Sequence, residues 1–318
     1  MKVIYYDNSN DVLTDEDHIL FSSIVGRDIA ELEAEIKKQD TRTIQEIYSN
    51  QKYIHNIKLN ELGLHVYRVI LANKTYQSRI DLSDQRVRDF YDQGYVIIEN
   101  FLPDLEFTKI KNLFEQHILP KYPNGVKKSV DASGFFDRNQ DYYNFIKQCA
   151  GVRQFSHDAP NGIPRTEFWN HIHEPGDTQY KLHTDTFQPT CKFWLYLEDI
   201  SEEQGPLGLV PKSHICNERR LKWDFENSRM AEGSEMWSRR IEKGGKPGSF
   251  RVFENSSVEE EEKEVLKLGY EGTKMMLGKK NSLVAVNTFC FHKRGLSTQG
   301  THRRTLTTQY RPVAFGVY

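Results

Sequence analysis

The residues with the clearest potential for chemistry are His183 and Asp185, in the segment from Lys181 to Phe187. On an extended backbone, side chains two residues apart point to the same face, so this imidazole and this carboxylate can bind one metal ion together. They would supply two of the three ligands of a 2-His-1-carboxylate site, which holds non-heme Fe(II) and leaves coordination positions open. We expect the third ligand to be His292, near the C-terminus. A His-x-Asp triplet is common by chance, so this interpretation depends on the surrounding sequence.

Other histidines compete for a metal ion. His171 and His173 also lie two residues apart and could form a cupin-like site, but Pro175 ends that strand at once. We therefore interpret both as structural residues. His214 follows a turn and is expected to be a hydrogen-bonded structural residue, and His157 lies in an isolated loop.

Short runs with strand character dominate the chain from residue 166 onward. They are rich in β-branched and aromatic residues, and turn clusters containing Gly, Pro and acidic residues separate them. This pattern is typical of a β-sandwich or jelly roll. The expected strands span residues 166–173, 191–197, 208–210, 282–286 and 304–310.

The first 80 residues have a different pattern, because apolar residues such as Ile29, Leu32 and Ile36 recur at helical spacing among charged neighbours. We expect residues 1–80 to form a helical extension packed on a catalytic core of residues 81–318.

At the start of that core, a helix over residues 85–92 is expected to end at Gly94, before a strand at 95–98. A long polar insertion at 215–278 is expected to interrupt the sheet rather than extend it. We interpret this insertion, which includes the acidic run 256–263, as a solvated acidic loop, with a mobile lid over 215–278 as the alternative.

Composition excludes several classes of partner. The chain has 43 Lys and Arg against 45 Asp and Glu, a net charge of −2, so no general attraction to nucleic acid or to a membrane surface is expected. The four cysteines are scattered and are interpreted as free thiols in a reducing compartment. The sequence contains no signal-peptide pattern and no apolar run of membrane-spanning length. We expect a cytoplasmic protein that is a monomer or a weak homo-oligomer.

Five features, in this order, resemble the phytanoyl-CoA dioxygenase family, and together they span about residues 84–312. They are the segment Asp92–Leu102, the motif His183–Asp185, the segment Phe193–Ser201, the segment Gln204–His214 and the block His292–Tyr310. The resemblance implies a mainly β fold with flanking helices around a double-stranded β-helix (jelly roll, cupin-like) that uses Fe(II), O2 and 2-oxoglutarate. The residues after His292 depart from the family pattern, because Lys293, Arg294 and Gly295 stand where Gly-Ser is common.

The resemblance also implies residues for the cosubstrate. The distal carboxylate of 2-oxoglutarate needs a buried partner, and an Arg fork can make two charge-assisted hydrogen bonds to it. We expect Arg303 in this role, because the family's Arg stands eleven residues after the distal His, whereas Arg304 points to the opposite face. Trp194 matches a family aromatic that flanks the cosubstrate, although a plain core Trp is the alternative. Asn170 could hydrogen-bond 2-oxoglutarate from the preceding strand.

The leading functional hypothesis is an oxygenase that converts 2-oxoglutarate to succinate and CO2 and hydroxylates an unactivated C–H bond of a small molecule. One alternative is the same oxidant used for oxidative cyclisation or desaturation in natural-product biosynthesis. Halogenation is disfavoured, because it needs a small residue where Asp185 stands. A non-catalytic jelly-roll binding protein is the alternative from another class. The sequence does not identify a CoA phosphate site, since Lys127–Lys128 and Arg219–Arg220 are interpreted as surface charge.

Overall fold

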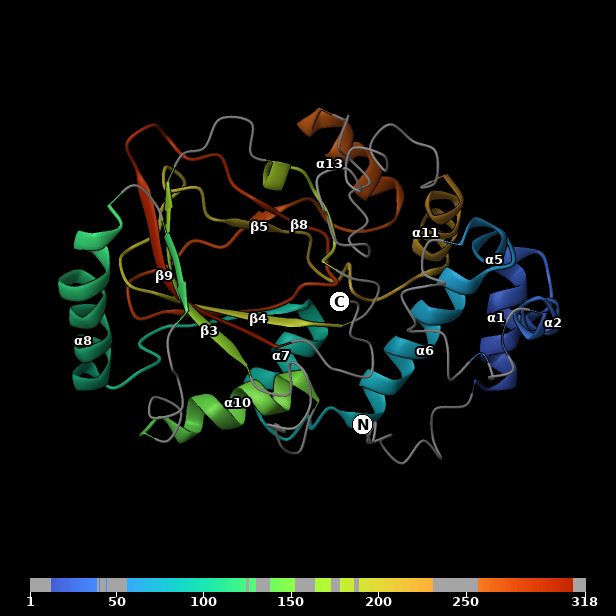
Figure 1. Cartoon of the computed structure of the whole chain (residues 1–318), viewed down its shortest axis with the longest axis horizontal. Coiled ribbons are helices and arrows are strands. Elements are labelled where there is room, and N and C mark those ends of the chain that lie inside the picture. Colours follow the sequence, from blue (N-terminus) through green and yellow to red (C-terminus); the bar gives the residue numbers. More distant parts are fainter. Residues whose placement is uncertain are drawn as a thin grey trace.

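The computed structural model describes residues 13–38, 40, 44, 56–123, 126–129, 138–151, 164–172, 178–185, 189–230 and 257–310. Two antiparallel β-sheets form its core (Figure 1). The larger sheet has the strand order β1-β7-β4-β9-β3-β2, and the smaller has the order β6-β5-β8. The strands are β1 (Tyr95–Ile98), β2 (Val126–Ser129), β3 (Arg165–Ile172), β4 (Cys191–Tyr196), β5 (Leu207–Leu209), β6 (Lys274–Met275), β7 (Leu283–Asn287), β8 (His292–Arg294) and β9 (His302–Tyr310).

The larger sheet has two different faces because side chains alternate along each strand. In β4, Phe193 and Leu195 belong to a core shared with the helices that cover the outer face. Trp194 and Tyr196 belong to a second core, which they share with Leu207 and other residues of the smaller sheet. The two sheets therefore pack against each other, and with their flanking helices they fit the expected jelly-roll core.

Helices surround this core on three sides. In Figure 1, α7 and α10 lie along one side of the larger sheet, α8 stands at one end, and α1, α2, α5, α6 and α11 gather at the other. Their bounds are α1 (Asp15–Val25), α2 (Ile29–Lys37), α5 (Ile57–Glu61), α6 (Leu64–Arg79), α7 (Gln85–Gln93), α8 (Asp104–Leu113), α10 (Gln140–Ala150), α11 (Glu218–Met230) and α13 (Val258–Lys267). Among the described residues, helices account for more of the chain than strands do. The expectation of a mainly β protein therefore fits the core but not the described residues taken together.

The N-terminal helices pack on the rest of the chain through an apolar cluster. Residues of α1, α2 and α6 share this cluster with Leu221 and Phe225 of α11 and with Phe289. The helical character expected for the N-terminal segment is therefore present in its described part. The division into an extension of residues 1–80 and a core domain stays a prediction. Within the described part of the chain, no helix combines the length and the apolar composition needed to cross a membrane.

Gly94 ends α7, as expected, and its backbone has a φ of 79°. A Cβ atom at this position would overlap the Sγ of Cys290 and lie 2.7 Å from the Nδ1 of His214. Both the left-handed backbone and the close packing therefore require glycine here. The turn leads directly into β1, which pairs with β7 beside the sheet centre.

The insertion at 215–278 differs from the expectation in two ways. Its last segment extends a sheet, because β6 pairs with β5 in the smaller sheet. Its acidic run forms a helix, α13, which begins with a capping box between Ser257 and Glu260. Glu261 in that helix is fully buried, so the run is not a solvated loop. Residues 231–256 lie outside the described residues, and the lid alternative stays a prediction.

Candidate metal centre

His183, Asp185 and His292 come together between the two sheets. Each offers one potential ligand atom, and these three atoms all lie within 4.8 Å of one another. No other group of three or more His, Cys, Asp or Glu residues among the described residues is arranged in this way. The ring centroids of the two histidines are 4.4 Å apart, and Nε2 of His292 is 3.7 Å from Oδ1 of Asp185. The structure thus assembles the three residues that the sequence analysis singled out.

Backbone hydrogen bonds hold the two ligand-bearing segments side by side. The N–H of His183 donates to the carbonyl of His292 at 3.0 Å, and the N–H of His292 donates to the carbonyl of His183 at 2.9 Å. Two residues further on, the N–H of Asp185 donates to the carbonyl of Thr288 at 3.1 Å. His292 also begins β8, which pairs with β5, so the smaller sheet positions this histidine.

Both histidines are held in the tautomer that suits a metal ligand. Nδ1 of His183 lies 2.7 Å from the carbonyl oxygen of Lys181, and Nδ1 of His292 lies 2.9 Å from that of Cys290. A carbonyl only accepts, so each Nδ1 carries the hydrogen and donates, which leaves Nε2 for a metal. Burial, together with the nearby His292, lowers the pKa of His183 to about 3. His183 is therefore neutral at physiological pH, as metal binding requires.

Lys192 orients the carboxylate of Asp185. Its Nζ lies 2.5 Å from Oδ2 of Asp185, while Oδ1 is the oxygen near His292. Lys192 reaches this position because it lies on β4 two residues before Trp194, on the face toward the smaller sheet. Sequence reasoning did not identify Lys192. The available signal was its spacing of two residues from Trp194, which places both side chains on the same face of the strand.

The donor set fits ferrous iron. Two neutral imidazole nitrogens and one carboxylate oxygen match the 2-His-1-carboxylate arrangement, and the hydrogen bonds to Lys181 and Cys290 are the outer contacts that such histidines usually have. The assignment of the three residues as metal ligands is part of the function proposed below.

Arg303 and Arg304 lie on opposite faces of β9. Arg303 stands opposite His171 in the β3–β9 register and is 5% exposed, and its Nη1 donates to the carbonyl of Gly205 at 2.5 Å. Arg304 forms an ion pair with Glu198 at 3.3 Å. Alternate residues of β9 pair with the inner-face residues of β4, so Arg303 is on the same face as the candidate metal centre.

Trp194 and Asn170 also lie on opposite faces of the larger sheet. Trp194 is buried on the inner face, opposite Thr307 of β9, and packs in the core between the sheets. Asn170 stands opposite Arg304, on the outer face, and its Nδ2 donates to the carbonyl of Pro123 at 3.4 Å. Strand alternation thus places Asn170 away from Arg303. The expected contact between Asn170 and 2-oxoglutarate is not supported.

Two of the competing histidines, His171 and His214, are described and lie outside this set. The ring of His171 makes an edge-to-face contact with Trp169, with centroids 4.9 Å apart. His214 is a hydrogen-bonded structural residue, as expected, because its Nε2 donates to the carbonyl of Tyr91 at 2.6 Å. Burial lowers the pKa of His214 to about 4. His157 and His173 lie outside the described residues.

Helices of the insertion pack behind the candidate metal centre. Leu182 and Phe291, which directly precede the two histidines, share a buried cluster with residues of α11 and α13. The guanidinium of Arg220 in α11 lies 3.6 Å from the centroid of the Phe291 ring and forms an ion pair with Asp224 at 3.0 Å. Arg220 is fully buried, so the interpretation of Arg219–Arg220 as surface charge is wrong for this residue.

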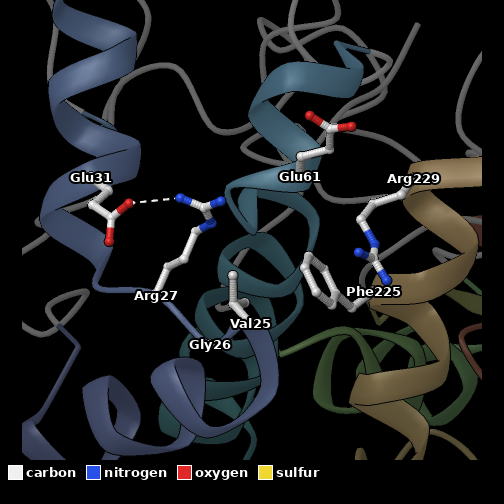
Figure 2. Close-up of a pocket in the computed structure, with 7 residues that line it drawn as sticks. All are labelled: Val25, Gly26, Arg27, Glu31, Glu61, Phe225 and Arg229. Atoms are coloured by element: carbon white, nitrogen blue, oxygen red, sulfur yellow. Dashed lines mark hydrogen bonds and ion pairs between the residues drawn. The ribbon is translucent and has the colours of Figure 1, made fainter.

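A pocket of about 630 Å³ lies elsewhere, at the junction of the N-terminal helices with α11 (Figure 2). Its wall includes an exposed ion pair between Arg27 and Glu31, and the guanidinium of Arg229 over the ring of Phe225. Glu61 completes its charged groups, and none of the lining residues belongs to the candidate metal centre. The pocket is therefore a separate surface feature.

Comparisons with known proteins identify a matching family and several similar solved structures. The family model described as Phytanoyl-CoA dioxygenase (PhyH) matches residues 90–258. No curated protein matches the chain. Among solved structures, similar chains include the non-heme α-ketoglutarate-dependent epimerase SnoN from nogalamycin biosynthesis, with 13% identity over 72% of this chain and 85% of that one and a TM-score of 0.39.

Two further similar structures come from Streptomyces. HygX from Streptomyces hygroscopicus, with nickel and 2-oxoglutarate bound, is 16% identical over 74% of this chain and 90% of its own, with a TM-score of 0.39. AviO1 from Streptomyces viridochromogenes Tue57 is 11% identical over 72% of this chain and 94% of its own, with a TM-score of 0.42. These three likenesses are distant, and the family match is independent of them. Because that match extends over more than half of the sequence, the chain belongs to the phytanoyl-CoA dioxygenase family.

Proposed function

We propose that the protein is an Fe(II)- and 2-oxoglutarate-dependent oxygenase that hydroxylates an unactivated C–H bond of a small molecule. The observation that carries the proposal is the convergence of His183, Asp185 and His292, with both histidine Nδ1 atoms bound to backbone carbonyls. Membership of the phytanoyl-CoA dioxygenase family supports this class of chemistry. We also propose that the two packed sheets are the halves of a double-stranded β-helix.

The three side chains would hold iron through Nε2 of His183, Nε2 of His292 and Oδ1 of Asp185. Together with 2-oxoglutarate, bound iron supplies an oxidant, made from O2, that is strong enough to remove hydrogen from an unactivated C–H bond. Lys192 keeps Oδ2 of Asp185 engaged, so that the carboxylate presents its other oxygen. Both histidines are buried, which limits the access of water to the centre.

Arg303 would bind the distal carboxylate of 2-oxoglutarate. It is buried on the inner face of β9, and its guanidinium is directed by the hydrogen bond to Gly205. A planar guanidinium can bind a carboxylate with two parallel hydrogen bonds. Trp194 lies on the same face and would flank the cosubstrate. Asn170 is left out of this assignment because of its position on the outer face.

The first experiment tests the cosubstrate. Protein mixed with Fe(II) and 2-oxoglutarate without oxygen should develop a weak visible charge-transfer band, and the Asp185→Ala variant should not. After air is admitted, succinate release should increase with one or more compounds of a metabolite panel. A wild-type protein that binds Fe(II) but forms no band with 2-oxoglutarate would contradict the proposal.

The product then identifies the outcome of the reaction. Hydroxylation adds one oxygen atom to the substrate, whereas cyclisation and desaturation each remove two hydrogen atoms without adding oxygen. Mass spectrometry of the product therefore separates these outcomes. A cytoplasmic location and a monomeric or weakly associated state stay predictions.

A further inference from the structure

One acidic residue of α13 differs from its neighbours. Glu259 and Glu260 are exposed at the start of the helix, whereas Glu261 is fully buried. A buried carboxylate is costly unless it is paired and hydrogen-bonded. The polar partners of Glu261 therefore indicate the role of this buried carboxylate.

Within the described part of the chain, the polar partners of Glu261 lie next to the two candidate metal-binding histidines in the sequence. Its Oε2 lies 3.2 Å from Nζ of Lys293, which directly follows His292. Its Oε1 lies 3.8 Å from Nζ of Lys181 and accepts a hydrogen bond of 3.4 Å from the N–H of Leu182. One carboxylate of the insertion is thus joined to both ligand-bearing segments.

The contact with Leu182 reaches the ring of His183 through one peptide group. The N–H of Leu182 and the carbonyl of Lys181 belong to the same peptide. The N–H end donates to Glu261, and the carbonyl end accepts from Nδ1 of His183 at 2.7 Å. A peptide group is planar, so an interaction that fixes its N–H also fixes the direction of its carbonyl. The carboxylate and the imidazole therefore bind opposite ends of one rigid unit.

We propose that Glu261 is a positioning residue for the metal centre. It fixes the peptide that orients His183 and, through Lys293, the strand that begins with His292. The inference rests on the proposed function, because it assumes that these histidines bind metal. Outer contacts of this kind orient ligands, and their removal typically lowers metal affinity about 10-fold to 100-fold.

An alternative is that Glu261 only holds α13 in place, without an effect on the ligands. The apolar cluster of Leu182, Phe291, Trp223, Val265 and Leu268 already joins α13 and α11 to the ligand segments. Loss of the carboxylate would then lower stability but leave metal binding unchanged. Metal affinity therefore distinguishes the two roles, and activity measurements are not required.

The test uses Co²⁺, whose visible spectrum reports its coordination. Glu261→Gln keeps the size and the acceptor oxygen of the side chain but removes its charge. We expect the Co²⁺ dissociation constant to rise about 10-fold to 100-fold and the Co²⁺ spectrum to change. Glu259→Gln, an exposed change on the same helix, is the matched control and should bind Co²⁺ like the wild type. Urea unfolding without metal measures stability in parallel.

Wild-type affinity and spectrum in Glu261→Gln, whatever its stability, would overturn the inference. Should that variant fail to fold, Glu261→Asp and Lys293→Met replace it, because each keeps part of the network. Weaker Co²⁺ binding by both would support the inference, and wild-type binding by both would overturn it. A wild-type protein that binds no Co²⁺ would instead contradict the proposed function, so the two failures are distinguishable.

Discussion

His183 and His292 exchange both of their backbone hydrogen bonds, at 3.0 and 2.9 Å, and their rings lie 4.4 Å apart. The candidate metal centre is therefore built on a short antiparallel bridge between two distant parts of the chain. The bridge depends on main-chain atoms and not on the imidazoles. Removing a ligand side chain should consequently leave the surrounding backbone in place.

The first prediction follows because the backbone of the candidate metal centre does not depend on its ligand side chains. His183→Ala, Asp185→Ala and His292→Ala should each abolish tight Fe(II) binding and 2-oxoglutarate turnover, because two donors do not replace a set of three. Circular dichroism should remain that of the folded protein. His171→Ala is the control, since the group of three potential ligands found among the described residues does not include His171, and it should bind Fe(II) normally. Loss of Fe(II) in the control would favour a site that includes His171.

The second prediction compares two glycines that end helices in the left-handed conformation. Gly26 has nothing within 4 Å of the position where a Cβ would lie, whereas Gly94 is packed against Cys290 and His214. Gly26→Ala should cost about 1–2 kcal/mol of unfolding free energy, because alanine is strained at positive φ. Gly94→Ala should cost about 1–3 kcal/mol more, because the added methyl overpacks the site. Urea denaturation measures both, and equal losses would show that the site beside Gly94 relaxes.

Much of this architecture follows from local patterns in the sequence. Runs rich in β-branched and aromatic residues located β4 and β9, and the glycine after the helical segment at 85–92 predicted the end of α7. The capping box at Ser257–Glu260, followed by Val265 and Leu268 at helical spacing, was sufficient to predict α13, but the acidic run was interpreted by its charge alone.

Other features depend on contacts between distant segments and could not be predicted in this way. Arg220 is buried because Phe291, from a distant part of the sequence, packs on its guanidinium. Lys192 reaches Asp185 only once β4 is placed in the sheet. Asn170 faces outward because β3 pairs with β9 in a register that sets it opposite Arg304. A one-residue change in that register would reverse this placement.

The third prediction concerns the buried pair in α11. Asp224→Ala leaves the guanidinium of Arg220 buried without its carboxylate partner and should cost about 3–5 kcal/mol of unfolding free energy. Glu218→Ala removes an exposed pair with Lys222 at the same helical spacing and should cost far less, because solvent screens an exposed pair. Urea unfolding of the two variants measures the difference. Similar small losses would mean that the aromatic contacts and the hydrogen bond to the carbonyl of Ser213 stabilise Arg220 without Asp224.

The fourth prediction concerns pH and His214. Burial lowers the pKa of this histidine to about 4 in the folded protein, while an unfolded histidine has a pKa of about 6.5. Between these values the unfolded chain binds the extra proton, so the stability present above about pH 6.5 falls as the pH falls toward 4. The loss attributable to His214 should be about 2 kcal/mol between about pH 7.5 and about pH 5.

His214→Gln removes this titration. The variant should be less stable than the wild type at neutral pH, because it disturbs the hydrogen bond to Tyr91, but the difference should shrink by about 2 kcal/mol at about pH 5. Urea unfolding at both pH values measures it. A difference that stays constant with pH would show that His214 is protonated equally in the folded and unfolded states.

The last prediction separates Arg303 from Arg304. The distal carboxylate of 2-oxoglutarate is the end that the metal does not hold, so its recognition depends on the protein. Arg303→Ala would leave that carboxylate without its charged partner, at about 3–5 kcal/mol by analogy with broken buried ion pairs. The affinity for 2-oxoglutarate should then fall by about two to three orders of magnitude or more, at about 1.4 kcal/mol per tenfold. Arg303→Lys restores the charge but not the planar fork and should recover part of the affinity.

Arg304→Ala is the matched control, because Arg304 pairs with Glu198 on the outer face of the same strand. It should change 2-oxoglutarate affinity much less, and Fe(II) binding should survive in all three variants, since the ligand set lies on other segments. Titration of the charge-transfer band with 2-oxoglutarate measures the affinities directly. A steep loss in Arg304→Ala together with normal affinity in Arg303→Ala would show that the cosubstrate binds on the outer face of β9, contrary to the proposed site.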